Sequence, residues 1–161
     1  MGIMFSIERI TEKTRPFINK QITKSWGSPY IVTRGILHDT RTHSGFAAVE
    51  NDEIRGYMLY HITENGLEIT ILESLCENKG IGSALVNAAI EKAKEAACHR
   101  VWLMTTNDNT RAIRFYQRFG FSLRAVYINA IAEARKLKPQ IPLKGYDGIP
   151  IDHEFEFELT L

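Results

Sequence analysis

Alternating apolar and polar residues predict a first strand over residues 5–10. Residues 11–25 have helical spacing, with Pro16 near the first turn or kinking the helix, and a Trp-Gly-Ser-Pro break follows at 26–29. Residues 30–44 show neither period, and we expect them to form a loop. The N-terminal part of the chain is therefore predicted to contain one strand and one helix.

Three strand-like runs follow one another in the middle of the chain, over residues 45–50, 53–63 and 67–76. A turn at residues 51–52 separates the first two. Asn65-Gly66 separates the second and third and is typical of a type I′ hairpin turn, because both residue types tolerate positive φ. These three strands are predicted to form an antiparallel meander.

Small apolar residues at helical spacing predict a helix over residues 83–97, followed by an apolar strand over 101–106. A strand–helix–strand unit with a right-handed crossover places this strand parallel to residues 67–76. Asn109 or Thr110 is expected to cap a short helix that ends near Gly120.

The remaining pattern predicts a strand over 121–128, a helix over 129–137 and a strand over 153–161 that pairs with 121–128 as a hairpin. The fold class is therefore α+β, with a mixed, mainly antiparallel sheet of about seven strands and helices on both of its faces.

Composition narrows the possible functions. The 161 residues suit one domain over 1–161, and the net charge of +1 gives no reason to expect nucleic acid as a partner. Cys76 and Cys98 have no metal-binding spacing, and the five histidines form no H-E-x-x-H motif, so we expect no metal site. No apolar run is long enough for a membrane span. We therefore expect a cytoplasmic protein that does not bind membranes.

A glycine loop carries the first chemical signal. Gly80-Ile81-Gly82 joins the apolar run 67–76 to the helix that starts near Ser83, which is a suitable arrangement for holding phosphate on backbone amides. The loop is not a P-loop, because Ser83-Ala84 replaces the required Lys and Ser/Thr. It is not a dinucleotide fingerprint either, because Leu85 is too bulky for the third position.

A second motif lies one helix and one strand further on. Asn109-x-x-Ala112-x-x-Phe115-Tyr116 is followed by Gly120-Phe121. Together with Glu77-x-x-Gly80-x-Gly82, it resembles the motifs of the GNAT superfamily of N-acetyltransferases over roughly residues 45–125. Glu77 departs from the Gln or Arg that is usual in that family.

The resemblance implies a fold in which strands 67–76 and 101–106 splay apart around the pantetheine arm of acetyl-CoA. It also implies transfer of an acetyl group to a small-molecule or peptide amine by a monomer or homodimer. The residues expected to hold the cofactor are Leu75, Cys76, Glu77, Asn78, Lys79, Gly80, Ile81, Gly82, Ser83, Asn109, Arg111 and Tyr116. Asn109 also reads as a helix cap, and Lys79 and Arg111 also read as ordinary surface cations.

Acetyl transfer to an amine needs a proton acceptor, an oxyanion donor and a proton donor for the thiolate. By resemblance Tyr116 is the acid, although it also fits the core face of its helix. Glu68 and Glu73 are the candidate bases, alongside a water relay. Their opposite parity places them on opposite sheet faces unless a bulge intervenes, and we favour Glu73. The backbone N–H of Leu75 is the expected oxyanion donor.

The acceptor pocket of the family draws on the first helices and the late hairpin. The residues expected there are Trp26, Tyr30, Arg34, His38 and Asp39, together with the insert 132–150. An acyl-CoA-binding protein without turnover is the alternative, and Glu77 would suit it. The sequence does not specify the amine.

Overall fold

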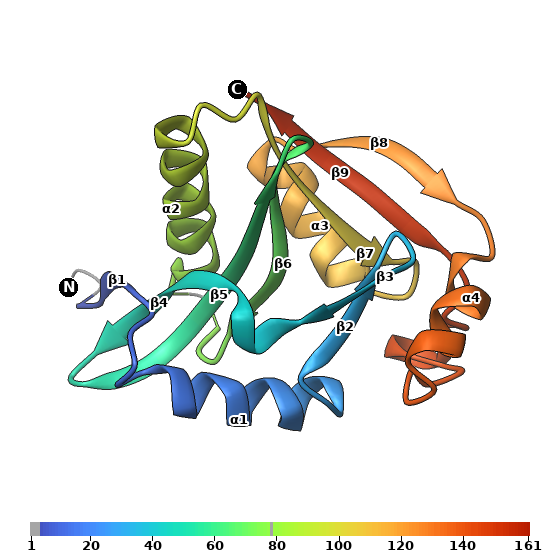
Figure 1. Cartoon of the computed structure of the whole chain (residues 1–161), viewed down its shortest axis with the longest axis horizontal. Coiled ribbons are helices and arrows are strands. Elements are labelled where there is room, and N and C mark those ends of the chain that lie inside the picture. The colour runs from blue at the N-terminus through green and yellow to red at the C-terminus, as the bar shows by residue number, and fades with distance from the viewer. Residues whose placement is uncertain (1–3, 78) are drawn as a thin grey trace.

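A computed structural model describes residues 4–77 and 79–161. A mixed sheet has the strand order β1-β4-β5-β6-β7-β9-β8 (Figure 1). Its strands are β1 (Ser6–Arg9), β4 (Ser44–Glu50), β5 (Glu53–Thr63), β6 (Gly66–Ser74), β7 (Arg100–Thr106), β8 (Ser122–Tyr127) and β9 (Glu154–Thr160). The helices are α1 (Arg15–Trp26), α2 (Ile81–Glu95), α3 (Thr110–Phe119) and α4 (Ala130–Leu137). The predicted fold class, the β4–β5–β6 meander and the parallel β6–β7 pair are confirmed.

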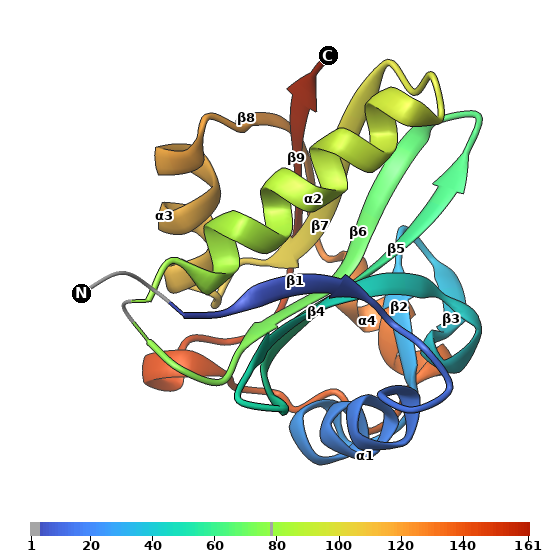
Figure 2. The ribbon, with the colours of Figure 1, turned by 90° about the vertical axis from the view of Figure 1, so that its left-hand side faces the viewer.

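Helices cover both faces of this sheet (Figure 2). On one face α2 and α3 bury the larger core, where Leu85 and Ala89 of α2 pack with Met58 and Leu103 of the sheet. On the other face α1 and a small hairpin bury a second cluster that includes Tyr57. Each helix therefore packs its apolar side against one face of the sheet.

The segment 30–44, which we expected to be a loop, forms the hairpin β2 (Tyr30–Thr33) and β3 (Ile36–Asp39) and a 3₁₀ turn, η1 (Thr40–Thr42). The expectation was wrong because the connecting turn is unusual. Arg34 takes φ 48° and Gly35 takes φ 74°, which is the left-handed pair of a type I′ turn. Arginine gives no sequence signal for that conformation, and each strand has only four residues.

The type I′ turn that we expected between β5 and β6 occurs instead between β4 and β5. The hairpin between β5 and β6 is present, but among its turn residues only Gly66 takes positive φ, at 113°, and Asn65 does not. The type I′ prediction was therefore wrong for Asn65-Gly66. Asn51 and Asp52, between β4 and β5, take φ 51° and 62°, and that hairpin carries the I′ geometry instead.

The register between β5 and β6 shifts by one residue. Leu59 pairs with Ile71 and Tyr60 pairs with Ile69, so Thr70 is an extra residue in β6. Such a bulge reverses the side-chain parity of the strand beyond it. We expected Glu68 and Glu73 on opposite faces unless a bulge intervened, and this bulge places them on the same face.

Both carboxylates instead face α1 and the small hairpin. Glu73 Oε1 accepts hydrogen bonds from Gln21 Nε2 at 2.9 Å and Ser25 Oγ at 3.1 Å, both on α1. Its Oε2 accepts from the hydroxyl of Tyr57 at 3.1 Å. Glu68 Oε1 lies 4.0 Å from Nε2 of His38 on β3. Glu73 therefore fastens α1 to the sheet.

Strands β6 and β7 separate as predicted. Their pairing covers Leu67–Ile69 of β6 and Val101–Leu103 of β7 and does not continue beyond these residues. Over its full length β7 pairs with β9 on its other edge. The sheet therefore opens between two neighbouring strands while β7 keeps a continuous partner.

Tyr57→Phe should lower the free energy of unfolding by about 1.5 kcal/mol, because it removes a buried hydrogen bond to the Glu73 carboxylate. For a chain of this size, the melting temperature should fall by roughly 3–6 °C. Tyr60→Phe, on the same strand, is the matched control and should change the melting temperature less. Equal melting temperatures for the two variants would contradict the fastening role of Glu73.

Candidate active site

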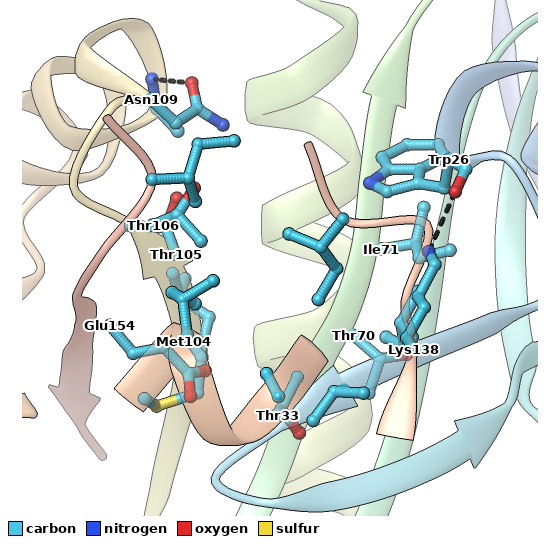
Figure 3. A pocket seen from close by; sticks show the side chains of 18 of the residues that line it. Trp26, Thr33, Thr70, Ile71, Met104, Thr105, Thr106, Asn109, Lys138 and Glu154 are labelled. Atoms are coloured by element: carbon cyan, nitrogen blue, oxygen red, sulfur yellow. Dashed lines mark hydrogen bonds between the residues drawn. The ribbon is translucent and has the colours of Figure 1, made fainter. Parts of the chain in front are cut away.

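A cavity of about 510 Å³ fills the opening between β6 and β7. Figure 3 shows its walls, with Asn109 and Glu154 on the side of β7 and Trp26 and Lys138 on the opposite side. The side chains that line it come from the end of α1, from β2, β6, β7, α3, α4, the segment after α4 and the start of β9. They include Trp26, Ile31, Val32, Thr33, Ile69, Thr70, Ile71, Leu72, Leu103, Met104, Thr105, Thr106, Asn109, Ala112, Tyr116, Ile131, Ala134, Lys138, Ile141 and Glu154.

Helix α3 supplies two polar groups to this cavity. Asn109 is the N-cap of α3, and its Oδ1 accepts from the backbone N–H of Ala112 at 3.2 Å, as predicted. Tyr116 is 6% exposed, and its ring packs edge-to-face with Phe115 and Phe121. Burial raises the pKa of the Tyr116 hydroxyl, which therefore stays protonated at neutral pH. Tyr116 is therefore a core residue that also lines the cavity.

Glu154 is a cavity carboxylate that the sequence analysis missed. It opens β9, is 4% exposed, and lies near Met104 and Thr33 at one end of the cavity (Figure 3). Burial raises its pKa, whereas the backbone N–H and the charge of Arg34 act in the opposite direction. Glu154 alternates with aromatic residues along its strand, and this pattern is typical of a polar side chain on the solvent-exposed face. No sequence signal marked it, because its position opposite the end of β7 follows only from the folded sheet.

Neither predicted base lines the cavity. Glu73 is held by α1, and Glu68 is buried beside His38. Burial raises the pKa of Glu68 to about 7. The backbone N–H of Leu75 is also engaged, because it donates to the carbonyl of Arg55 at 2.8 Å. The bulge of β6 falls at Thr70 and not at Leu75, so the predicted oxyanion donor is corrected as well.

The glycine loop leads into the N-terminus of α2. Gly80 is the N-cap, with φ 73° and ψ 12°, and the first intrahelical bond runs from Ala84 N–H to its carbonyl. The N–H groups of residues 81–83 therefore precede the helical ladder, as an anion site requires. No acidic residue occupies this first turn. Asn78, also predicted to hold the cofactor, lies outside the described residues.

Gly82 also affects the packing of α2 against α3. A Cβ built on Gly82 would lie 3.3 Å from Cζ of Phe115, so its lack of a side chain also lets α2 approach α3 closely. A substitution at Gly82 would therefore disturb packing as well as any ligand. This makes Gly82→Val, the obvious test of a phosphate cradle, a poor one.

Two charged residues of the loop region pair with each other. Arg111 Nη1 lies 3.1 Å from Oε1 of Glu77, and both side chains are well exposed. The contact turns Glu77 toward α3, although such a surface pair contributes little stability. Lys79 is exposed, and Cys76 is half-buried with its Sγ 3.9 Å from Arg55 Nη1.

The structure brings only Trp26 of the five predicted acceptor residues into the cavity wall. Tyr30 and Asp39 instead contact Arg41 on an exposed face. Arg34 lies over the Tyr127 ring and 3.8 Å from Glu156. The prediction was wrong for these residues, and Ile31, Val32 and Thr33 of β2 line the cavity instead.

His38 also lies outside the cavity wall. It is buried, and its Nε2 lies 2.8 Å from the hydroxyl of Thr33. Thr33 itself lines the cavity, so His38 stands behind the wall that we expected it to form.

The insert 132–150 contributes to the wall as expected, through Ala134, Lys138 and Ile141 among others. Lys138 Nζ donates to the carbonyl of Trp26 at 2.8 Å and so joins α4 to the end of α1. Burial lowers the pKa of Lys138. This side of the cavity is therefore built by residues far apart in the sequence.

Within residues 4–77 and 79–161, none of the helices has the length and apolar composition needed to cross a membrane.

Known proteins resemble this chain in sequence and in fold. The uncharacterized protein YdhI of Bacillus subtilis (strain 168) is 46% identical over 139 residues, covering 86% of this chain and 87% of YdhI. The uncharacterized N-acetyltransferase YvbK of the same organism is 34% identical over 85 residues, covering 50% of this chain and 54% of YvbK.

A GNAT family acetyltransferase from Elizabethkingia anophelis, solved with acetyl-CoA bound, matches 98% of this chain and 99% of its own with a TM-score of 0.70 at 18% identity. At that identity the likeness concerns the fold. The family model described as the acetyltransferase (GNAT) family matches residues 9–121, which include the β6–α2 loop, the splayed strands and α3. The chain therefore belongs to the GNAT family of acetyltransferases.

Proposed function

We propose that this protein is an acetyl-CoA-dependent N-acetyltransferase that moves the acetyl group from the thioester to a primary amine. The observation that carries the proposal is the cavity between β6 and β7, which has both Tyr116 and Glu154 in its wall, while the N-terminus of α2 packs at Gly82 against Phe115 beside Tyr116. Family membership supports acetyl transfer, and the relative YvbK is itself named as an N-acetyltransferase.

The residues present fit coenzyme A. The amides of residues 81–83 suit its diphosphate, because they are free of helical partners and carry the positive end of the helix dipole. The gap between the unpaired parts of β6 and β7 suits the pantetheine arm, with Asn109 at its side. When bound, acetyl-CoA supplies an activated acetyl thioester. Arg111 pairs with Glu77, so its charge offsets a carboxylate that would otherwise repel the phosphates.

Glu154 is the base in this proposal. An alkyl amine has a pKa of about 10.4 and arrives as ammonium, so a proton must leave before the nitrogen can attack. Glu154 is the carboxylate among the described lining residues, and its raised pKa makes it a stronger base than an exposed glutamate. Glu73 and Glu68 are assigned structural roles instead.

The oxyanion donor is assigned to the backbone N–H of Leu72. Leu75 donates to Arg55 across the β5–β6 pair, and hydrogen-bonded positions alternate along an antiparallel ladder. Glu73 therefore points its N–H toward β5, while Leu72 points its N–H toward the opposite edge, where β7 has separated. Leu72 also lines the cavity. A preorganised amide in this position stabilises the charge that develops during acyl transfer.

Tyr116 is the acid that protonates the departing thiolate. Its hydroxyl is protonated at neutral pH because burial raises its pKa, and it belongs to the cavity wall. The ring is held by Phe115 and Phe121, which fixes the direction of the hydroxyl. The acceptor, a small-molecule or peptide amine, then enters from the side of Trp26 and Lys138.

The proposed diphosphate site on the amides of residues 81–83 is tested by Ser83→Asp. The new carboxylate should weaken coenzyme A binding at least tenfold by repelling the diphosphate, yet leave the melting temperature unchanged or slightly higher, since acidic residues stabilise a first helical turn by about 0.3–1 kcal/mol. Titration calorimetry and thermal denaturation measure the two effects, with Ser83→Ala as the matched control. A folded Ser83→Asp protein with the affinity of Ser83→Ala would argue against the cradle.

Tyr116→Phe should lower kcat at least tenfold with little change in coenzyme A affinity, because it removes the proton donor and keeps the ring, and general acids contribute about 10²–10⁴-fold. Release of free thiol from acetyl-CoA with a panel of amines measures the rate. If the unmodified protein binds coenzyme A but releases thiol with none of the amines, the alternative of an acyl-CoA-binding protein without turnover is favoured.

Glu154→Gln should lower kcat/KM at least tenfold and remove the acidic limb of the pH profile. Since the folded-state pKa of Glu154 is raised, stability is lost as the pH rises through that pKa. The Gln variant should therefore be more stable than the parent at about pH 8 and equal to it near pH 4, by thermal denaturation. Glu73→Gln is the control and should keep the acidic limb; loss of the limb there instead would restore Glu73 as the base.

A further inference from the structure

Three histidines that are distant in the sequence meet behind the cavity wall. His38 lies on β3, His43 directly precedes β4, and His61 lies on β5. One ring nitrogen from each of them falls within 4.8 Å of the others. His38 and His43 are buried, whereas His61 is exposed and leaves a route from solvent. Their spacing along the chain gave no hint of this, and the acetyl-transfer chemistry does not use them.

The spacing of the rings suits one metal ion. Ring centroids are 5.3 Å apart for His38 and His43, 5.7 Å for His38 and His61, and 5.2 Å for His43 and His61. A tetrahedral Zn²⁺ at about 2.0–2.1 Å from each nitrogen places the ring centroids roughly 5 Å apart. The backbone therefore already holds the three imidazoles at the separation that such an ion requires.

The two buried rings have the outer partners that metal-binding histidines usually have. His38 Nε2 lies 2.8 Å from the hydroxyl of Thr33, and His43 Nδ1 lies 2.9 Å from the hydroxyl of Thr70. A hydroxyl that holds one ring nitrogen fixes the orientation of the imidazole and leaves the other nitrogen free as a ligand. Two of the three proposed ligands are thus already positioned.

Glu68 provides an independent observation that favours a cation beside the histidines. Its carboxylate is 4% exposed, and Oε1 lies 4.0 Å from His38 Nε2. Its Oε2 is buried and has no hydrogen-bond partner among residues 4–77 and 79–161. A carboxyl oxygen left in this state is costly, and a nearby divalent cation would compensate it.

We propose that His38, His43 and His61 bind one divalent transition-metal ion, Zn²⁺ being the ion that three imidazoles suit best. Three protein ligands leave a fourth position for water. The rings of His43 and His61 are nearly parallel, at 5°, and an ion lies in the plane of each ring that binds it. Binding therefore turns the exposed His61 ring about its soft χ2 torsion.

The ion would link the β2–β3 hairpin to the main sheet. His38 belongs to β3 and His61 to β5, so one metal ion joins two elements that belong to different sheets. Thr33 and Thr70 contact the metal-binding rings on one side and line the cavity on the other. The site therefore supports the wall of the cavity from behind.

The experiment uses the untagged full chain, freed of metal with EDTA and dialysed. Titration calorimetry with Zn²⁺ should give one site per chain, and saturating Zn²⁺ at about 100 times Kd should raise the melting temperature by roughly 5 °C or more. Co²⁺ should give the visible absorption of a tetrahedral site without a thiolate charge-transfer band, which excludes Cys76 and Cys98 as ligands.

His61→Ala removes the exposed ligand and should weaken Zn²⁺ binding about 100-fold or more, since even partners of a ligand contribute 10–100-fold. His99→Ala, a histidine outside the cluster, is the matched control and should bind as the parent does. Because His61 is exposed, the variant should retain its fold, which circular dichroism checks. Absence of binding by the parent chain, or equal binding by the two variants, would overturn the proposal.

Discussion

The limited pairing between β6 and β7 is the constraint on which the rest of this structure depends. Hydrogen bonds join the two strands over three residue pairs only, next to the point where Thr70 adds a residue to β6. Past that point each strand keeps its outer partner and loses its inner one. The result is a cavity with backbone groups in its wall, in the middle of a sheet that is otherwise continuous.

The bulge at Thr70 also decides which side chains belong to the cavity. By reversing parity it places Glu68 on the same face as Glu73, which two donors of α1 and the hydroxyl of Tyr57 on β5 hold, while Leu72 lines the cavity. Because neighbouring residues of a strand face opposite ways, Glu73 anchors a helix while Leu72 beside it lines the cavity. The acidic group of the cavity then comes from another strand, as Glu154 of β9.

Sequence patterns predicted the structure correctly wherever a few neighbouring residues determine the backbone geometry. Asn109 caps α3, and the loop at Gly80 leads into α2, because cap and turn chemistry act over a few residues. The bulge was beyond such reasoning, since register is a property of two strands together. The β2–β3 turn was missed because Arg34 takes a positive φ, which an arginine in the sequence does not indicate. Glu154 and the three histidines were missed because only the folded chain brings their partners near.

The position of β9 has a consequence for how the sheet assembles. Strand β9 follows β8 in the chain, yet it inserts between β7 and β8, pairing Val101 with Leu159 and Leu123 with Phe157. Until β9 docks, β7 and β8 both present open edges, which are templates for incorrect strand pairing. Pairing across such sequence distances raises contact order and slows folding. The strand that brings Glu154 to the cavity thus also covers one edge of β7 and one edge of β8, so this part of the cavity wall and the pairing of both strands form in the same event.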